Sequence, residues 1–428
     1  MTHAVRSGLP HVVIAVANLP VERDRRVIRE VKALESAGFR VTVICPRGAK
    51  RLTRVPGTRD ARIRSYKMIE SSGGIVSFAV EFGWSFLAIG WHLTWAVLRD
   101  RAIAAQACNP PDVFWPLALI MRALRRPFIF DHHDLSPEVY AARGGTPNPM
   151  VMKVLLAFEK LSQRCASAVV STNESYREFA INRGGCDPSR VVVVRNGPAS
   201  AEVASSQAPS EDAEKIIVYL GVLGPQDGVD QAILAAEKLV EHRGRLGWKL
   251  VVAGDGECLA DLRALATERK LDDIVEFTGW LEVEAIDRLL RSASIGLQPD
   301  PRSAHAEVST MAKTVEYLAR GLPVVAVDMR ETRRSAGDAG IYVPTGGPDE
   351  LADALHGLLD DAPSRARMRE VALARFRNSL AWEHQAAAYV RLWHELLSRR
   401  LERYKAGSPA RQSTPDTAMT NQAEERLL

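Results

Sequence analysis

The order of apolar and amphipathic stretches constrains the fold of this chain more than any other feature. Short apolar runs alternate with helical patterns, first from residues 11–17 (HVVIAVA) through a helical pattern over 25–37 to residues 40–45 (RVTVIC). The same alternation starts again at residues 216–220 (IIVYL). Strand–helix–strand units of about 35 residues favour parallel, doubly wound sheets. The sequence therefore predicts an α/β protein with two such sheets.

A polar stretch separates the two series. Residues 198–213 (PASAEVASSQAPSEDA) are rich in Ala, Ser and Pro, a composition typical of a linker between domains. The chain has 428 residues, which is enough for two domains of about 200 residues each. We expect an N-terminal domain over residues 1–197, a linker over 198–213, a C-terminal domain over 214–382, a terminal helix over 383–405 and a disordered tail over 406–428.

The charge is divided unevenly along the chain. Residues 1–200 contain 28 Lys and Arg against 16 Asp and Glu, a net charge of +12. Residues 201–428 contain 28 against 36, a net charge of −8. One interpretation is a solvated surface of uneven charge. The other is that the basic half faces something anionic, such as a phospholipid surface or a lipid-diphosphate acceptor.

Cysteine usage and the first residues predict a cytoplasmic protein. The five cysteines are widely spaced and form no Cys-x-x-Cys pair, which favours reduced, mostly buried thiols and argues against a metal cluster. No long apolar run follows a basic start, so we expect no signal peptide. With 46% hydrophobic and 25% charged residues, the composition is that of a soluble globular protein.

One apolar segment stands apart from this pattern. Residues 75–98 carry a single formal charge, Glu81, together with Trp84, Trp91 and Trp95. A bilayer span needs roughly 17–25 residues, so a span, a buried helix and a helix lying at a membrane interface all remain open. A basic run over residues 47–67 precedes the segment. We expect peripheral binding to the anionic inner face of the cell membrane, without a span.

The stretch with the most chemical content is residues 309–328 (STMAKTVEYLARGLPVVAVD). A helix carrying Lys313 and Glu316 is followed directly by an apolar strand. A carboxylate in the first turns of a helix can accept hydrogen bonds from a ribose diol. A lysine three residues earlier shares its face and can contact phosphate oxygens. The spacing alone favours an ordinary surface Lys–Glu pair on an amphipathic helix over a ligand site.

This stretch resembles the donor-binding helix of family 4 glycosyltransferases with the GT-B fold. It is most similar to the bacterial surface-polysaccharide branch, in which a Lys precedes Glu-Tyr and then Gly-x-Pro-Val. The resemblance covers most of the chain. Four further motifs carry it in the expected order: residues 24–27 (DRRV), 131–138 (DHHDLSPE), 221–228 (GVLGPQDG) and 251–256 (VVAGDG).

The resemblance implies a fold and an activity. The fold is GT-B, two Rossmann-like domains facing a cleft, with the terminal helix returning to the N-terminal domain. The activity is retaining hexosyl transfer from a nucleotide sugar to a glycan or lipid-linked acceptor in surface-polysaccharide synthesis. Such enzymes generally need no metal or other cofactor, because Lys, Arg and backbone amides stabilise the leaving diphosphate. No nucleic acid partner is expected.

The same resemblance implies two sets of site residues. The catalytic set is His132, His133, Asp134 and Glu316. The donor-binding set is Arg26, Gly221, Gly224, Gly254, Arg302, Glu307, Ser309, Thr310, Lys313 and Glu316. For the two histidines, a structural role is the alternative. A zinc site built from His132, His133 and Asp134 is disfavoured, because adjacent histidines rarely converge on one metal.

The sequence departs from the family pattern in two places. Val222 and Asp227 stand where many members have an Arg and a Lys that hold the diphosphate. A Glu-x7-Glu motif ending at Glu316 would begin at Val308, whereas Glu307 lies one residue earlier. We therefore expect Lys313 to replace the missing cations, with Arg302 as a helper.

Two other functions remain open from the sequence. One is a sugar-nucleotide epimerase of the same architecture, which would need no acceptor. The other is a non-catalytic glycan-assembly subunit, suggested by Val222 and Asp227. Fold alone does not decide between them.

Overall fold

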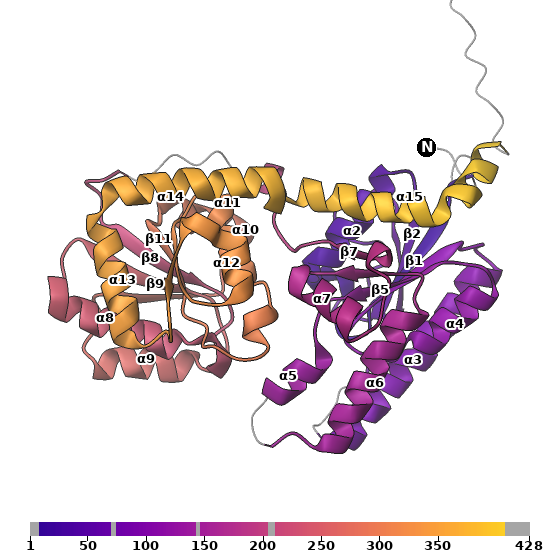
Figure 1. Ribbon diagram of the computed structural model, residues 1–428, viewed down its shortest axis with the longest axis horizontal. Coiled ribbons are helices and arrows are strands. Elements are labelled where there is room, and N and C mark those ends of the chain that lie inside the picture. The colour runs from indigo at the N-terminus through magenta and orange to yellow at the C-terminus, as the bar shows by residue number, and fades with distance from the viewer. Residues whose placement is uncertain (1–7, 70–73, 143–145, 204–209, 407–428) are drawn as a thin grey trace, which may run out of the picture.

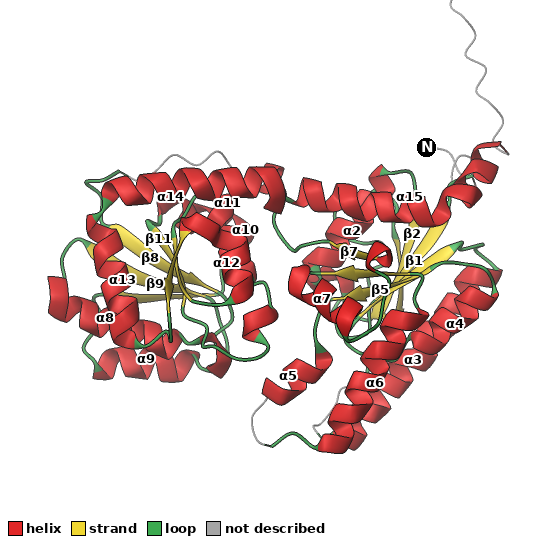
Figure 2. Cartoon of the chain, viewed as in Figure 1, coloured by secondary structure: helices red, strands yellow, loops and turns green. Residues whose placement is uncertain are grey.

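The computed structural model describes residues 8–69, 74–142, 146–203 and 210–406. Within these residues the chain forms two parallel sheets, each covered by helices on both faces (Figures 1 and 2). This confirms the predicted α/β fold class. Residues 204–209 of the expected linker and nearly all of the expected tail lie outside the described residues.

The N-terminal sheet has seven described strands in the order β3-β2-β1-β4-β5-β6-β7, all parallel. They are β1 (His11–Ala15), β2 (Arg40–Pro46), β3 (Arg62–Tyr66), β4 (Ala104–Cys108), β5 (Phe128–His132), β6 (Ala168–Ser171) and β7 (Val191–Val193). The central strands β1, β4, β5 and β6 are buried along their whole length, which explains their nearly continuous apolar sequence.

Two helices of this domain illustrate how side-chain caps set where a helix begins. Asp24 caps the first long helix through the Val27 N–H, and Asn173 caps α7 through the Tyr176 N–H. The helices are α2 (Arg25–Ser36), α3 (Ile75–Leu98), α4 (Trp115–Ala123), α5 (Ser136–Ala142), α6 (Pro149–Cys165) and α7 (Glu174–Asn182), with 3-10 turns η1 (Val21–Arg23), η2 (Pro188–Arg190) and η3 (Ser200–Glu202).

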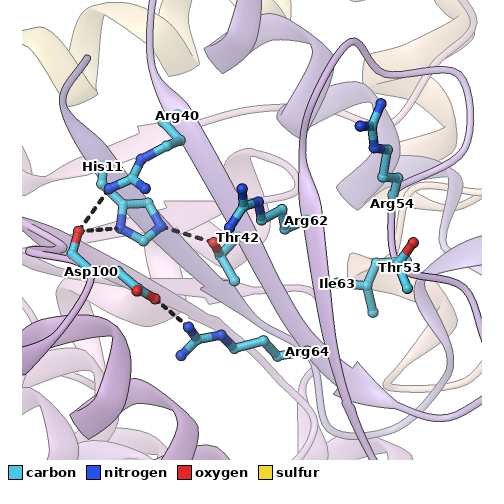
Figure 3. Close-up of a pocket in the computed structure, with 9 residues that line it drawn as sticks. All are labelled: His11, Arg40, Thr42, Thr53, Arg54, Arg62, Ile63, Arg64 and Asp100. Carbon is cyan, nitrogen blue, oxygen red and sulfur yellow. Dashed lines mark hydrogen bonds and ion pairs between the residues drawn. The ribbon is translucent and has the colours of Figure 1, made fainter. Parts of the chain in front are cut away.

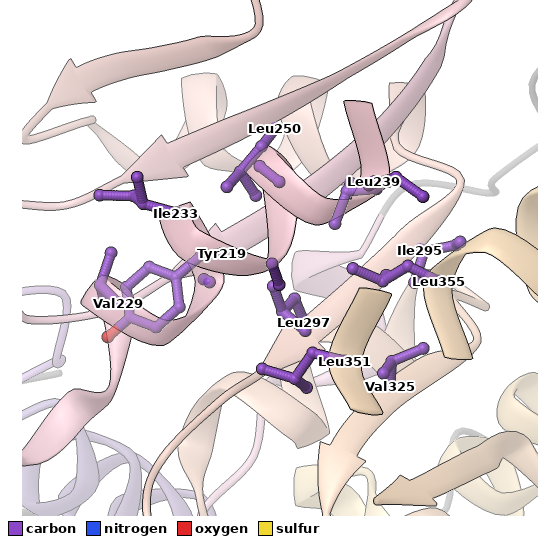
Figure 4. Packing of buried hydrophobic residues seen from close by; sticks show 14 of the residues in the cluster. Tyr219, Val229, Ile233, Leu239, Leu250, Ile295, Leu297, Val325, Leu351 and Leu355 are labelled. Atoms are coloured by element: carbon purple, nitrogen blue, oxygen red, sulfur yellow. The ribbon is translucent and has the colours of Figure 1, made fainter. Parts of the chain in front are cut away.

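The C-terminal sheet has six described strands in the order β10-β9-β8-β11-β12-β13, again all parallel. They are β8 (Lys215–Leu220), β9 (Trp248–Ala253), β10 (Val275–Gly279), β11 (Ile295–Gln298), β12 (Val324–Val327) and β13 (Gly340–Val343). Figure 4 shows the core on one face of this sheet, where Leu250, Leu297 and Val325 contact helix residues such as Ile233 and Leu351.

The C-terminal helices complete both domains. They are α8 (Val229–Arg243), α9 (Leu259–Glu268), α10 (Val283–Ser292), α11 (Ala312–Ala319), α12 (Arg330–Ala336), α13 (Pro348–Asp360), α14 (Ala362–Arg375) and α15 (Trp382–Ala406), with short turns η4 (Pro225–Asp227), η5 (Ala306–Val308), η6 (Gly337–Ala339) and η7 (Phe376–Leu380). Figure 1 shows α14 and α15 end to end along one side of both domains. Tyr389 and Trp393 of α15 are buried in the N-terminal core, so this helix ties the two domains together.

The apolar segment forms α3, and its two sides differ. Ile89 and Leu93 are buried against the sheet, whereas Trp84, Leu87 and Trp91 are 41%, 64% and 64% exposed. None of the described helices is long and apolar enough to cross a membrane. The buried-helix interpretation therefore holds for one side of α3 only.

Candidate functional site

Two glycine-containing loops meet at the carboxyl edge of the C-terminal sheet. The loop after β8 starts at Gly221, and the loop after β9 starts at Gly254. A Cβ at Gly254 would overlap the Gly221 carbonyl oxygen, and one at Gly256 would lie 2.5 Å from the Leu223 oxygen. These glycines are required because the two backbones touch. Gly224 has another role, since its N–H donates to Asp227 Oδ2 at 3.1 Å.

Lys313 lies against this loop, in the first turn of α11. Its ammonium is 2.8 Å from Asp300 Oδ1 and 3.4 Å from Asp227 Oδ1, and it sits 4.5 Å from the centre of the Tyr219 ring. Only 9% of the side chain is exposed. Burial raises the pKa of Asp300, although Lys313 opposes the shift. Lys313, the residue expected to bind the diphosphate, is thus already paired with two acidic side chains.

Glu316 follows one turn later and is less buried. Its carboxylate pairs with Arg320, four residues along the same helix, and 23% of its side chain is exposed. Arg320 is nearly buried and also contacts Asp287 at 3.1 Å. Arg320 therefore holds the Glu316 carboxylate in place while part of this side chain faces solvent. This arrangement suits a residue that accepts hydrogen bonds from a ligand.

The segment before α11 contributes side chains of two kinds. Arg302 and Glu307 form a 3.6 Å ion pair, and Arg302 also donates to the Asp328 carbonyl. Within the described residues Arg302 makes no hydrogen bond or ion pair with Lys313 or with residues 221–228, and its helper role stays a prediction. Ser309 instead faces the other domain, where its hydroxyl lies 3.1 Å from the Tyr176 hydroxyl.

The contact between the domains centres on Glu331, which sequence reasoning missed. Glu331 is fully buried and accepts hydrogen bonds from the Ser175 N–H at 3.1 Å and the Ser175 hydroxyl at 2.7 Å, at the start of α7. It also pairs with Arg334 at 2.8 Å and Arg195 at 3.5 Å, and the Thr310 hydroxyl lies 3.5 Å from it. No motif could have revealed this residue, because its partners come from distant parts of the chain.

Arg26 belongs to a buried network of the N-terminal domain. Its guanidinium pairs with Asp131 at 2.9 Å and Glu30 at 3.0 Å and donates to the Val194 carbonyl at 2.7 Å. Burial alone would raise the pKa of Asp131, but Arg26 and His133 hold this pKa below its usual range. The side chain is 6% exposed and fixes α2 to the sheet, while its expected donor contact stays a prediction.

The two adjacent histidines have different surroundings. His132 is fully buried, and its Nε2 lies 3.2 Å from Glu159 Oε1. Glu159 raises the pKa of His132 against the effect of burial. His132 therefore has no surface open to a substrate in this conformation, and its catalytic role stays a prediction. His133 is 17% exposed, and its Nε2 lies 2.7 Å from Asp131 Oδ2.

Asp134 follows His133 and is held by its backbone. Asn109 Oδ1 accepts both the His133 and Asp134 N–H groups, at 2.6 and 3.1 Å. Across the domain boundary is His305, which sequence reasoning also missed. Burial lowers the pKa of His305, while the charges of Asp134 and Glu138 act in the opposite direction. The charges of the N-terminal domain therefore act on His305 across the boundary between the domains.

Among the described residues, one group has the arrangement of a metal site. Ligand atoms of Cys108, Asp131 and His133 all lie within 4.8 Å of one another. Arg26 Nε lies 3.0 Å from His133 Nε2, so a guanidinium already supplies positive charge there. Burial, with the charge of Asp131, raises the pKa of the Cys108 thiol well above its usual range. A protonated thiol beside an arginine is a poor metal ligand.

Comparisons with known proteins agree with this geometry. The model of the glycosyl transferase 4-like domain matches residues 24–197, and that of the glycosyl transferases group 1 matches residues 201–375. Alpha-D-kanosaminyltransferase from Streptomyces kanamyceticus is 33% identical over 411 residues, covering 89% of this chain and 95% of that protein.

Two solved structures share the fold. Sucrose-phosphate synthase from Thermosynechococcus elongatus has a TM-score of 0.68 at 17% identity, covering 91% of this chain and 100% of that one. An Anabaena protein solved in complex with UDP has a TM-score of 0.65 at 15% identity, covering 91% and 100%. The chain is therefore a glycosyltransferase and belongs to the GT-B family whose two domains these models describe.

Proposed function

We propose that this glycosyltransferase moves a hexose from a nucleoside-diphosphate sugar to a lipid-linked or glycan acceptor in surface-polysaccharide synthesis, with retention of configuration. The observation that carries the proposal is the position of Lys313 and Glu316 on α11, beside the loop of residues 221–228. A cation and a partly exposed carboxylate, one helical turn apart, match a diphosphate and a ribose diol. The UDP bound by the Anabaena protein of similar fold supports a nucleotide donor.

Asp227 shows how an anion would be held. Its carboxylate accepts the Gly224 N–H at 3.1 Å and lies 3.4 Å from Lys313 Nζ. A backbone N–H and an ammonium are the groups that a diphosphate oxygen requires. Asp227 therefore occupies the position of the ligand, and we infer that the donor displaces it. Lys313 and backbone amides would then stabilise the leaving diphosphate, with no metal required.

Roles for the remaining residues follow from their exposure. Glu316 would hold the ribose. His133 and Asp134, at the carboxyl edge of β5, would contact the donor sugar or position the acceptor hydroxyl. A front-face retaining mechanism needs no enzyme nucleophile, so Asp134 would act without a covalent intermediate.

The test is calorimetric titration with UDP-, GDP- and dTDP-sugars, followed by transfer assays with the donor that binds. The kanosaminyl donor class belongs in the panel because of the 33% identical relative. Binding of one donor and product only in the presence of an acceptor would support the proposal. Rearrangement of the donor alone would favour an epimerase. Absence of binding to every donor would favour a non-catalytic subunit and overturn the proposal.

Our proposal that the acceptor lies at a membrane is based on the exposed apolar side of α3. Trp84, Leu87, Trp91, Trp95 and Leu98 share this side, and exposed apolar residues of the neighbouring helices extend it: Leu119 and Ile120 on α4, Met150 and Val154 on α6. Exposed patches of this kind mark partner or membrane contacts. Together with the net charge of +12 over residues 1–200, they support docking of this domain on an anionic membrane surface.

A further inference from the structure

A cavity of about 310 Å³ lies at the amino edge of the N-terminal sheet. His11, Arg40 and Arg62 are the first residues of β1, β2 and β3, which are neighbours in the sheet. The proposed catalytic residues His133 and Asp134 follow β5 at the carboxyl edge. Because all these strands are parallel, the cavity and the proposed catalytic residues lie at opposite edges of one sheet.

The lining of the cavity is strongly cationic. Four of its nine lining residues are arginines, and the single acid is Asp100 (Figure 3). His11 Nδ1 lies 3.1 Å from the Asp100 carbonyl, which can only accept, so this nitrogen carries the proton and Nε2 accepts from the Thr42 hydroxyl at 2.8 Å. Burial, with the charges of Arg40 and Arg64, lowers the pKa of His11 to about 4. At neutral pH the lining therefore has a net charge of +3.

Two of the arginines are fixed by hydrogen bonds within the fold. Arg40 donates to the Asp100 carbonyl at 2.7 Å, and Arg64 pairs with the Asp100 carboxylate and donates to the His92 carbonyl at 3.4 Å. Such contacts complement the negative carboxyl end of α3. They explain the positions of Arg40 and Arg64 without invoking a bound ligand.

The other two arginines have no comparable structural role. A backbone bridge places Arg54 beside Arg62, and both side chains are exposed. Arg54 makes one long ion pair, 3.8 Å to Asp60, and Arg62 makes none within the described part of the chain. The cavity thus combines two fixed guanidinium groups with two that are available to a ligand.

We propose that this cavity binds a phosphate-bearing anion. Guanidinium groups form paired hydrogen bonds to phosphate oxygens, and a net charge of +3 favours a multiply charged phosphate over a single carboxylate. The volume is near the lower limit for small-molecule sites, which suits a phosphate, a diphosphate or a phospholipid headgroup but not a whole nucleotide sugar. This site is separate from the donor site and does not depend on the proposed transfer reaction.

The test compares the full-length protein with the double variant Arg54→Ala/Arg62→Ala. The matched control is Lys50→Ala/Arg51→Ala, which removes the same charge from exposed members of the same basic run that do not line the cavity. Each protein is titrated calorimetrically with inorganic pyrophosphate and, separately, floated with vesicles of phosphatidic acid or phosphatidylcholine. All three proteins retain the donor site and the two variants lose the same charge, so a difference between the two variants reports the cavity.

We expect the double variant to bind at least ten-fold more weakly than the wild type and the control in one of the two arms. A difference confined to pyrophosphate identifies a soluble ligand, and one confined to phosphatidic acid identifies a headgroup; either supports the site. Equal binding by the double variant and the control in both arms overturns it. The unfolding temperatures of the three proteins without ligand check that the exposed substitutions leave the fold intact.

Discussion

Lys313 Nζ lies 2.8 Å from Asp300 Oδ1, so the cation that the sequence assigns to the donor diphosphate is paired within its own domain. The second partner, Asp227, is farther away at 3.4 Å and more exposed, at 14% against 5% for Asp300. It also lies on a surface loop, whereas Asp300 follows a buried strand. We therefore expect Asp227 to give way to a ligand and Asp300 to keep Lys313 in place.

Removing the charge of Asp227 should strengthen donor binding. In Asp227→Asn, a diphosphate no longer competes with a carboxylate for Lys313 and the Gly224 N–H, and we expect roughly ten-fold tighter binding of the nucleoside diphosphate, about 1.4 kcal/mol. Calorimetry measures the change. Asp230→Asn, an exposed acid on the adjoining helix, is the control. Unchanged or weaker binding in Asp227→Asn would show that Asp227 does not occupy the diphosphate position.

Removing Lys313 should affect both binding and stability. Lys313→Ala should weaken binding of a nucleoside diphosphate more than binding of the nucleoside, because the lysine contacts only phosphate in the proposed site. It also leaves Asp300 and Asp227 without their counter-ion, at a cost of about 3 kcal/mol in the free energy of unfolding. Urea unfolding and paired titrations test these two effects. Equal weakening for both ligands would count against a diphosphate contact.

Glu316→Ala should lower kcat/KM about a hundredfold, corresponding to roughly 3 kcal/mol for a charge-assisted contact. Arg320 keeps its 3.1 Å contact with Asp287, so we expect the fold to persist. Asp287→Ala disturbs Arg320 from the other side without changing Glu316 and is the matched control. If both variants lose activity equally, Glu316 acts only through Arg320.

The buried His11 predicts a pH-dependent stability. Its pKa falls from 6.5 to about 4 on folding, so between these values the unfolded chain binds the proton more readily. The stabilisation is complete above about pH 6.5 and is lost as the pH falls towards 4, with a total on the order of 3 kcal/mol. The stability of the wild type relative to His11→Gln, measured by urea unfolding, should be higher at pH 7.5 than at pH 4.5. Parallel curves for the two proteins would contradict this.

The exposed side of α3 predicts membrane binding with two components. Trp91→Ser should reduce flotation with anionic vesicles several-fold at both low and high salt, because buried apolar area is not screened. Wild-type binding itself should fall with salt, because each Lys or Arg near the surface contributes about 1 kcal/mol that salt screens. Trp280→Ser is the control, since Trp280 is 71% exposed in the C-terminal domain. Equal flotation of both variants would exclude α3 from the contact.

Sequence patterns predicted those features that are determined by residues close to one another along the chain. The alternation of strands and helices gave the α/β class with two parallel sheets, and the three-residue spacing placed Lys313 and Glu316 on one helix, α11. The two histidines show where such reasoning stops. They are adjacent in the chain, yet His132 is the last residue of the buried strand β5 and lies against Glu159, whereas His133 follows the strand and is partly exposed.

The sequence by itself determined the fold class, the family motifs and the helix that carries the proposed donor contacts, because each depends on local spacing along the chain. Only the tertiary structure decided which charges meet. Lys313 finds Asp300, Glu331 finds Ser175 of the other domain, and the parallel register brings Arg40 and Arg62 to one cavity. These partners are separated by between 13 and 156 residues, and no local pattern encodes a distance across a fold.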